Sequence, residues 1–151
     1  MSIEVSVQVE DFSVSYEHQC LSDGSHSGAV VTFCGNVRDM NLGDCIKGLT
    51  LEHYPGMTEK IINHICSEAI SRWSIEKIRV VHRVGELNVG EQIVFVGVAS
   101  GHRREAFSAC EFIMDNLKTR APFWKKERTT DSTRWIDARS SDSDAVLRWD
   151  K

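Results

Sequence analysis

The sequence of 151 residues predicts a mixed α+β fold in one domain, and three observations support this prediction. Several short segments alternate apolar and polar residues or are rich in β-branched residues, as strands are. Two longer segments repeat their apolar residues with the 3.6-residue period of a helix. The chain has no internal repeat and no low-complexity linker, so one core is expected over residues 1–151.

Two strands are predicted in the N-terminal third of the chain. Apolar residues alternate with polar ones over residues 3–9, which is typical of a half-buried strand. The polar stretch that follows, through Ser27, is expected to be a loop. From Gly28 the run GAVVTFCGNV is almost continuously apolar, which predicts a strand covered on both faces and ending near Arg38.

The middle of the chain predicts a strand and then a helix. Residues 47–53 alternate again, and Pro55-Gly56 breaks the strand before Thr58, the expected N-cap of the helix. The apolar residues of this helix fall on one face, which is expected to pack on a sheet. They are Ile61, Ile62, Ile65, Cys66, Ala69, Ile70 and Trp73.

The C-terminal half predicts an antiparallel strand pair, a second helix and further extended chain. Glycines separate the strands expected at 78–84 and 93–100. The helix is expected over about 103–118, and Pro122 ends its pattern before FWKKE resumes an extended path. Trp135 is placed in a last short strand.

The composition limits the function classes. A net charge of -4 and a pI near 5.8 provide no basic face for general nucleic-acid binding. Five cysteines without a C-x-x-C pair predict free thiols and no structural metal. We expect Cys34, Cys66 and Cys110 to be core thiols. No apolar stretch is long enough for a membrane span and no signal peptide is expected, so the protein is predicted to be cytoplasmic.

A basic cluster in this acidic chain gives the strongest functional signal. In KTRAPFWKKER, five cations surround the single acid Glu127; they are Lys118, Arg120, Lys125, Lys126 and Arg128. The cluster is equally explained as a solvated helix end, where cations favourably meet the helix dipole. Phe123 and Trp124 favour a binding wall instead, suited to a planar heterocycle that carries a phosphate.

The lysines of this cluster are also candidate activated amines. An unperturbed lysine, with a pKa of about 10.4, is almost entirely protonated at pH 7. One like charge at about 4 Å contributes roughly 4 kcal/mol at an effective dielectric of 20, more than the roughly 3 kcal/mol needed to bring that pKa to about 8. We therefore take activation of Lys118 or Lys125 as a hypothesis.

A second basic signal is SGHRR, where His102, Arg103 and Arg104 are predicted to open a helix after a strand. Such a corner binds anions through the helix amides. Taken alone, His102 is better explained as a helix-start residue that the backbone satisfies, and Arg38 and Arg139 as ordinary surface arginines.

Ordered blocks along nearly the whole chain resemble the large, catalytic subunit of molybdopterin synthase, the MoaE family. The blocks are GAVVTFCGNVRDMNLGD, LTLEHYPGMTEK, HRVGEL, IVFVGVAS, HRREAF, FIMDNLKTRAPFWKKE and RWIDAR. The resemblance implies an α/β hammerhead-type fold, with a mostly antiparallel mixed sheet and two main helices. It implies a homodimer that forms the core of a heterotetramer, and neither a cofactor nor a metal.

The implied reaction is sulfur transfer from a small ubiquitin-like partner subunit of the MoaD type. The C-terminal Gly-Gly tail of that partner carries a thiocarboxylate, and two sulfurs pass to cyclic pyranopterin monophosphate to form the dithiolene of molybdopterin.

The resemblance also implies roles for individual residues. Lys118 is similar to the catalytic lysine beside the partner tail, and Arg120 and Phe123 are expected to help bind that tail. Lys125 is similar to the catalytic lysine on the substrate side. The substrate-binding residues are expected to be Arg38, His102 and Arg103, with Arg139 contributed across the dimer.

Two other functions remain open from the residues alone. One is a non-catalytic module that binds the acidic C-terminal tail of a partner. The other is a phosphate-handling hydrolase with His102 as general acid or base, although the sequence shows no convincing nucleophile or metal cluster for it.

Overall fold

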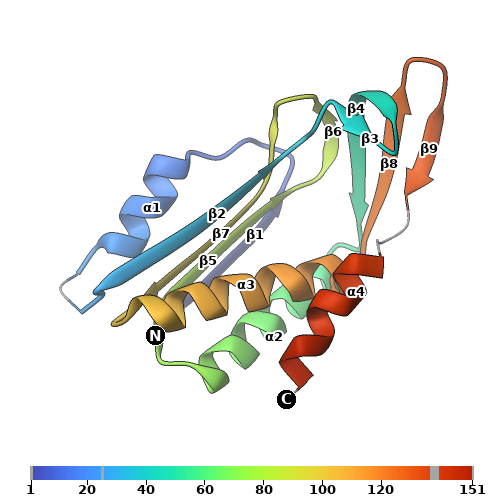
Figure 1. Ribbon diagram of the computed structural model, residues 1–151. Helices are drawn as coiled ribbons and strands as arrows, with labels where there is room; N and C mark the ends of the chain where they lie inside the picture. Colours follow the sequence, from blue (N-terminus) through green and yellow to red (C-terminus); the bar gives the residue numbers. More distant parts are fainter. Residues whose placement is uncertain (1, 25, 137–139, 151) are drawn as a thin grey trace.

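A computed structural model of the chain describes residues 2–24, 26–136 and 140–150. A long four-stranded sheet lies beside a second sheet of five strands, and helices cover both faces of the long sheet (Figure 1). The predicted α+β class is confirmed, as are the two main helices and the mostly antiparallel pairing.

The first sheet has the strand order β1–β5–β7–β2, in which only β1 and β5 pair in parallel. Its strands are β1 (Ser2–Gln8), β5 (Ile75–Arg83), β7 (Gln92–Ser100) and β2 (Ala29–Asn36). The second sheet is antiparallel, in the order β3–β4–β8–β9, with β6 also paired to β4. Its strands are β3 (Met40–Asn41), β4 (Asp44–His53), β8 (Phe123–Thr129), β9 (Thr133–Ile136) and β6 (Gly85–Asn88).

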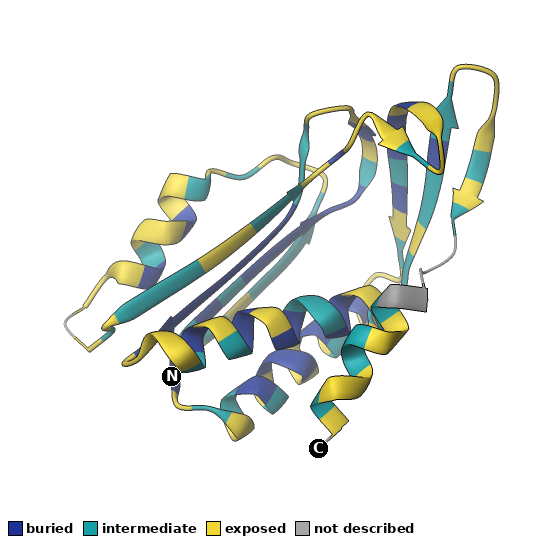
Figure 2. Cartoon of the chain, in the orientation of Figure 1, coloured by how far each residue is buried: buried dark blue, intermediate teal, exposed yellow. Residues whose placement is uncertain are grey.

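Two long helices, α2 (Met57–Arg72) and α3 (Arg103–Arg120), cover one face of the first sheet. The apolar stripe predicted for each helix faces the sheet, and Figure 2 shows buried positions along these facing surfaces. Fully buried members of this core include Ile62, Ile65, Ile78, Val80, Val96 and Ile113. Pro122 follows α3, so the predicted helix stop is correct within two residues.

The prediction of a loop through Ser27 is wrong, because this segment contains α1 (Val14–Ser22) on the opposite face of the first sheet. The Ser13 hydroxyl caps the helix by accepting a 3.2 Å hydrogen bond from the Tyr16 amide. Leu21 is fully buried, and Glu17 forms an ion pair with Arg79 of β5. A nine-residue helix with so small an apolar face depends on these tertiary contacts, which the sequence pattern does not reveal.

Two further details differ from the sequence predictions. The N-cap of α2 is Gly56, at φ 85°, and the Glu59 carboxylate accepts a 3.2 Å hydrogen bond from its amide. Thr58, the expected cap, is instead fully buried. Strand β2 was expected to be covered on both faces, but it lies at one edge of its sheet, has no fully buried residue and leaves Phe33 41% exposed.

The cysteine predictions hold for two of the three expected core thiols. Cys66 and Cys110 are buried, and burial raises the pKa of each thiol to about 12. Cys34, on β2, is only half-buried, so the prediction is wrong for this thiol. All five cysteines are unpaired.

The chain ends in a helix that the sequence patterns did not indicate. Helix α4 (Ser140–Leu147) and the short 3₁₀ helix η1 (Arg148–Asp150) lie against α3. Arg148 forms ion pairs with Glu111 at 2.5 Å and with Asp115 at 2.7 Å, both on α3. The Trp149 indole donates a 2.6 Å hydrogen bond to the same Asp115 carboxylate.

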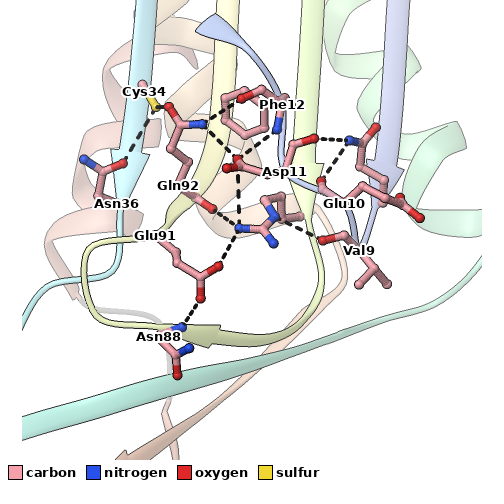
Figure 3. Close-up of polar contacts among 11 residues, drawn as sticks. Val9, Glu10, Asp11, Phe12, Cys34, Asn36, Asn88, Glu91 and Gln92 are labelled. Carbon is pink, nitrogen blue, oxygen red and sulfur yellow. Dashed lines mark hydrogen bonds and ion pairs between the residues drawn. The ribbon is translucent and has the colours of Figure 1, made fainter.

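A buried arginine joins the N-terminal segment to the start of β7. Arg83 donates hydrogen bonds to the Val9 carbonyl at 3.1 Å and the Gln92 carbonyl at 3.1 Å, and lies 3.4 Å from the Glu91 carboxylate. Figure 3 shows the labelled partners converging, with Asp11 also bound to the Gln92 amide. This network holds the end of β5 to the segment after β1 and to the start of β7, on the face of the sheet that α1 covers.

An Arg83→Met variant is expected to lose about 2–4 kcal/mol of unfolding free energy, because two carbonyls lose a charged donor in a buried position. Urea denaturation followed by circular dichroism measures the loss. Arg104→Met, at an exposed position of α3, is the matched control and is expected to change stability by less than about 0.5 kcal/mol. Equal stability of the two variants would contradict a structural role for Arg83.

Candidate active site

A cavity of about 430 Å³ lies where the end of β2, the second sheet and the C-terminal half of α3 meet. Its lining is both apolar and charged, which is typical of sites that bind small molecules. Four residues singled out by the sequence line it together: Arg38, Lys118, Phe123 and Lys125. Three predicted anion-binding side chains therefore share one concave site with an aromatic wall.

Local structure explains why these side chains converge. Lys118 lies in the last turn of α3, where cations favourably meet the helix dipole. The chain then turns at Pro122, whose carbonyl accepts a 3.2 Å hydrogen bond from the buried Thr58 hydroxyl. Strand β8 starts at the next residue, and Phe123 and Lys125 lie on one of its faces because strand side chains alternate. Arg38 follows Val37, whose amide donates a 2.9 Å hydrogen bond to the Glu91 carbonyl.

The alternation of side chains along β8 also corrects the prediction that both Phe123 and Trp124 form the binding wall. Trp124 is 48% exposed and does not line the cavity, so of the two expected aromatic residues only Phe123 lies in its wall, which Phe33 of β2 also lines. Lys126 also lies outside the cavity, with its ammonium 4.8 Å from the centre of the Trp135 ring. The basic cluster is thus divided between the two faces of β8.

The cavity also contains a carboxylate that is held by neutral and cationic partners. Glu127 is buried, and its two oxygens accept hydrogen bonds of 3.0 and 2.9 Å from the Asn41 side-chain amide. The Arg134 guanidinium donates a third hydrogen bond at 3.3 Å. These contacts attach the β3–β4 hairpin to β8 and fix one side of the cavity. A single acid within a run of five cations was the sequence signal for this residue.

His82 is a cavity residue that the sequence reasoning missed. It continues the inward face of Ile78 and Val80 on β5 and is 7% exposed. Burial lowers the pKa of His82 to about 4; its hydrogen bond with the Arg83 carbonyl opposes this effect, and the charges of Lys125, Lys118 and His53 add to it. The imidazole is therefore neutral at pH 7. A histidine at a core-facing strand position was the available signal.

Arg120 lies outside the main cavity, although it was expected to help bind the partner tail. It lines a separate, open groove along α2 together with Met57 and Lys60. Its guanidinium forms a 2.5 Å ion pair with Glu68 of α2. This contact gives Arg120 a role in joining α3 to α2.

The His102–Arg103 corner lies at the opposite end of α3 from Lys118. Arg103 begins the helix and both corner residues are exposed. At about 1.5 Å per residue, the 15 positions from Arg103 to Lys118 span about 22 Å. One chain therefore does not bring this corner into the cavity. Arg139 lies outside the described residues.

The described part of the chain offers neither a metal site of clustered side chains nor a membrane-spanning helix. Among residues 2–24, 26–136 and 140–150, no group of three or more His, Cys, Asp or Glu side chains is placed to hold a metal ion. Within these same residues, none of the helices combines the length and the hydropathy that a membrane span requires.

Comparisons with known proteins agree with this architecture. The family model described as MoaE protein matches residues 7–120. The chain is 62% identical over 150 residues to the molybdopterin synthase catalytic subunit of Vibrio cholerae serotype O1, covering 99% of this chain and all of the relative. The MoaE protein of Burkholderia ambifaria matches its structure with a TM-score of 0.83 at 46% identity, covering 97% of each chain.

A more distant structure shares the fold. It is the complex of subunits 1 and 2 of molybdopterin-converting factor from Helicobacter pylori, which matches with a TM-score of 0.69 at 19% identity and covers 91% of this chain and 92% of that chain. The family match spans most of the chain and the relative from Vibrio cholerae spans nearly all of it. This chain therefore belongs to the MoaE family.

Proposed function

We propose that this chain is the catalytic subunit of a molybdopterin synthase, a sulfurtransferase of molybdenum cofactor biosynthesis. It would pass two sulfurs from the C-terminal thiocarboxylate of a small MoaD-type partner to cyclic pyranopterin monophosphate. The observation that carries the proposal is the convergence of Arg38, Lys118 and Lys125 in one cavity beside Phe123. The relative from Vibrio cholerae, which bears the name of this subunit, supports it.

The cavity suits the proposed substrates in size and charge. About 430 Å³ falls within the range of small-molecule sites, and Phe123 offers a face to a planar pterin ring. Both the substrate phosphate and the partner thiocarboxylate are anions, which cationic side chains bind and orient. Two anions are brought together only if positive charge offsets their repulsion. The lysines and Arg38 supply that charge.

Each lysine has a separate proposed role in sulfur transfer. Lys118 holds the thiocarboxylate tail. Lys125 lies on the substrate side, where it stabilises the negative charge on the oxygen substituent that leaves a substrate carbon as the sulfur of the partner bonds to that carbon. The thioester between partner and substrate is then hydrolysed by water, which leaves a carboxylate on the partner and a thiolate on the substrate. A second charged partner molecule repeats the transfer.

The substrate site is completed by a second copy of the chain in this proposal. His102 and Arg103 lie about 22 Å from Lys118 along α3, too far to reach the same ligand. We propose a two-fold homodimer in which the corner of one copy lies at the cavity of the other, with Arg139 in the same cross-subunit role. One partner bound to each copy then gives a heterotetramer. Light scattering of the isolated chain should give twice its 17.1 kDa mass.

The chain is proposed to form one domain over residues 1–151 and to act in the cytoplasm. The five unpaired cysteines support a reducing compartment, where thiols persist.

The deciding assay mixes the chain with thiocarboxylated partner and cyclic pyranopterin monophosphate and follows the dithiolene product by mass spectrometry. Formation of the product only when all three are present supports the proposal. Partner binding without product would favour a non-catalytic binding module. Phosphate release without the partner would favour a hydrolase.

A further inference from the structure

We infer that His82 is a positioning residue for Lys125 and acts on it through the ring of Phe123. The observation behind this inference is a stacked pair of rings in the cavity wall. The imidazole of His82 and the ring of Phe123 lie 3.8 Å apart between centroids, with 17° between their planes. Both residues line the cavity with Lys125. Because turnover is the main readout, the inference rests on the proposed function.

The imidazole itself is held in a fixed orientation. Its Nδ1 lies 2.9 Å from the Arg83 carbonyl oxygen, and since a carbonyl only accepts, Nδ1 carries the proton and donates. Arg83 is in turn held by its hydrogen bonds to the Val9 and Gln92 carbonyls. His82 is also paired within the sheet, beside Val7 on one side and Val94 on the other. The ring is thus a rigid surface.

Strand β8 connects Phe123, which packs on the imidazole, to Lys125. Phe123 and Lys125 are two residues apart and lie on the same face of β8, so the strand that carries one ring also sets the direction of the lysine. The start of β8 is held at a second point by the hydrogen bond from Thr58 to the Pro122 carbonyl. If the stack is lost, Phe123 loses its support from the imidazole while the hydrogen bond to the Pro122 carbonyl remains, and Lys125 is positioned less firmly.

A neutral aromatic ring suits this position better than a charged one. The lysines that share the cavity disfavour a third cation beside them, and burial keeps the imidazole uncharged at neutral pH. The ring therefore supports Phe123 without repelling the ammonium groups. In this inference, position 82 requires a flat side chain that packs on Phe123. The second ring nitrogen, which faces away from Arg83, has no part in positioning Lys125.

Two substitutions distinguish the effect of the stack on Phe123 from the effect of the hydrogen bond to the Arg83 carbonyl. His82→Phe keeps a flat ring against Phe123 but loses the donor to Arg83, whereas His82→Asn keeps a donor at the place of Nδ1 but loses the ring. We expect His82→Asn to lower kcat about 10–100-fold with KM within about threefold, because small misplacements of reacting groups are costly. His82→Phe is expected to restore kcat to within about threefold of the wild type.

The experiment includes a readout that is independent of turnover. Trinitrobenzenesulfonate modifies lysine amines, and peptide mass spectrometry gives the rate at Lys125 in the isolated chain. That rate is expected to rise several-fold in His82→Asn and to stay near the wild-type rate in His82→Phe. His18→Asn, at an exposed position of α1 on the other face of the sheet, is the matched control and should match the wild type in both readouts.

The outcomes distinguish this inference from its alternatives. Equal loss of kcat in both His82 variants would overturn it in favour of a direct chemical role for the imidazole, and full kcat in both would also overturn it. If His82→Asn does not fold, Phe123→Leu breaks the same stack from the other side and is expected to give the same rise in Lys125 labelling. If the wild type makes no product, the proposed function fails, and the labelling rates still decide the positioning role.

Discussion

A Lys125→Met variant is expected to lose at least about 100-fold in kcat while still folding and still binding the partner subunit. A single preorganised charge that stabilises a transition state typically contributes a factor of about 10²–10³, and an acid–base group about 10²–10⁴. Methionine keeps much of the length and the apolar stem of lysine and removes only the charged amine. The measurement is the rate of dithiolene formation with saturating thiocarboxylated partner and substrate.

The next residue provides a matched control for this prediction. Lys126 lies on the opposite face of β8, above the Trp135 ring, and does not line the cavity. Lys126→Met therefore removes the same charge from the same strand and is expected to keep kcat within about threefold, since surface substitutions have small effects. If the two variants lost activity equally, the cavity would not be the site of the reaction.

Mixed dimers are expected to recover activity that neither parent variant has. A Lys125→Met copy carries an intact His102–Arg103 corner, and a copy with His102→Ala and Arg103→Ala carries an intact cavity. In a two-fold dimer of the two, one of the two composite sites is complete, so purified mixed dimers should reach about half of the wild-type rate. Two different affinity tags allow the mixed dimer to be isolated and assayed.

A second mixture serves as the control for this recovery. Lys118 and Lys125 line the same cavity, so a mixed dimer of Lys118→Met and Lys125→Met copies contains no complete site and is expected to stay inactive. If the first mixture also stayed inactive, the corner would not be contributed by the second copy, and its distance from Lys118 would exclude it from the site.

The predictable part of the site came from local sequence rules. The apolar stripe of α3 and the stop at Pro122 place Lys118 at a helix end and Lys125 in the strand that follows. The separation of Arg103 from Lys118 also follows from helix length alone, because the rise per residue is fixed. The family resemblance implied that His102, Arg103 and Lys125 all bind the substrate, and the length of α3 means that a single chain does not bring the first two to the cavity.

Other features depended on contacts between distant segments. Helix α1 is stabilised by the burial of Leu21 and by the ion pair of Glu17 with Arg79, which is 62 positions away. His82 owes its neutral state to burial beneath Phe123, a residue of a different sheet. Local periodicity carries no information about contacts between distant segments, so neither helix α1 nor the neutral state of His82 was predictable from it.

The sequence by itself determined the α+β class, the core-facing stripes of α2 and α3, and the group of cations around Pro122, because each depends on local periodicity or local charge. Only the tertiary structure decided which face of β8 lines the cavity. Alternation assigns Phe123 and Lys125 to one face and Trp124 and Lys126 to the other, but both faces are aromatic and basic. The packing of β8 between β4 and β9, with His82 against Phe123, makes the first pair the wall of the site.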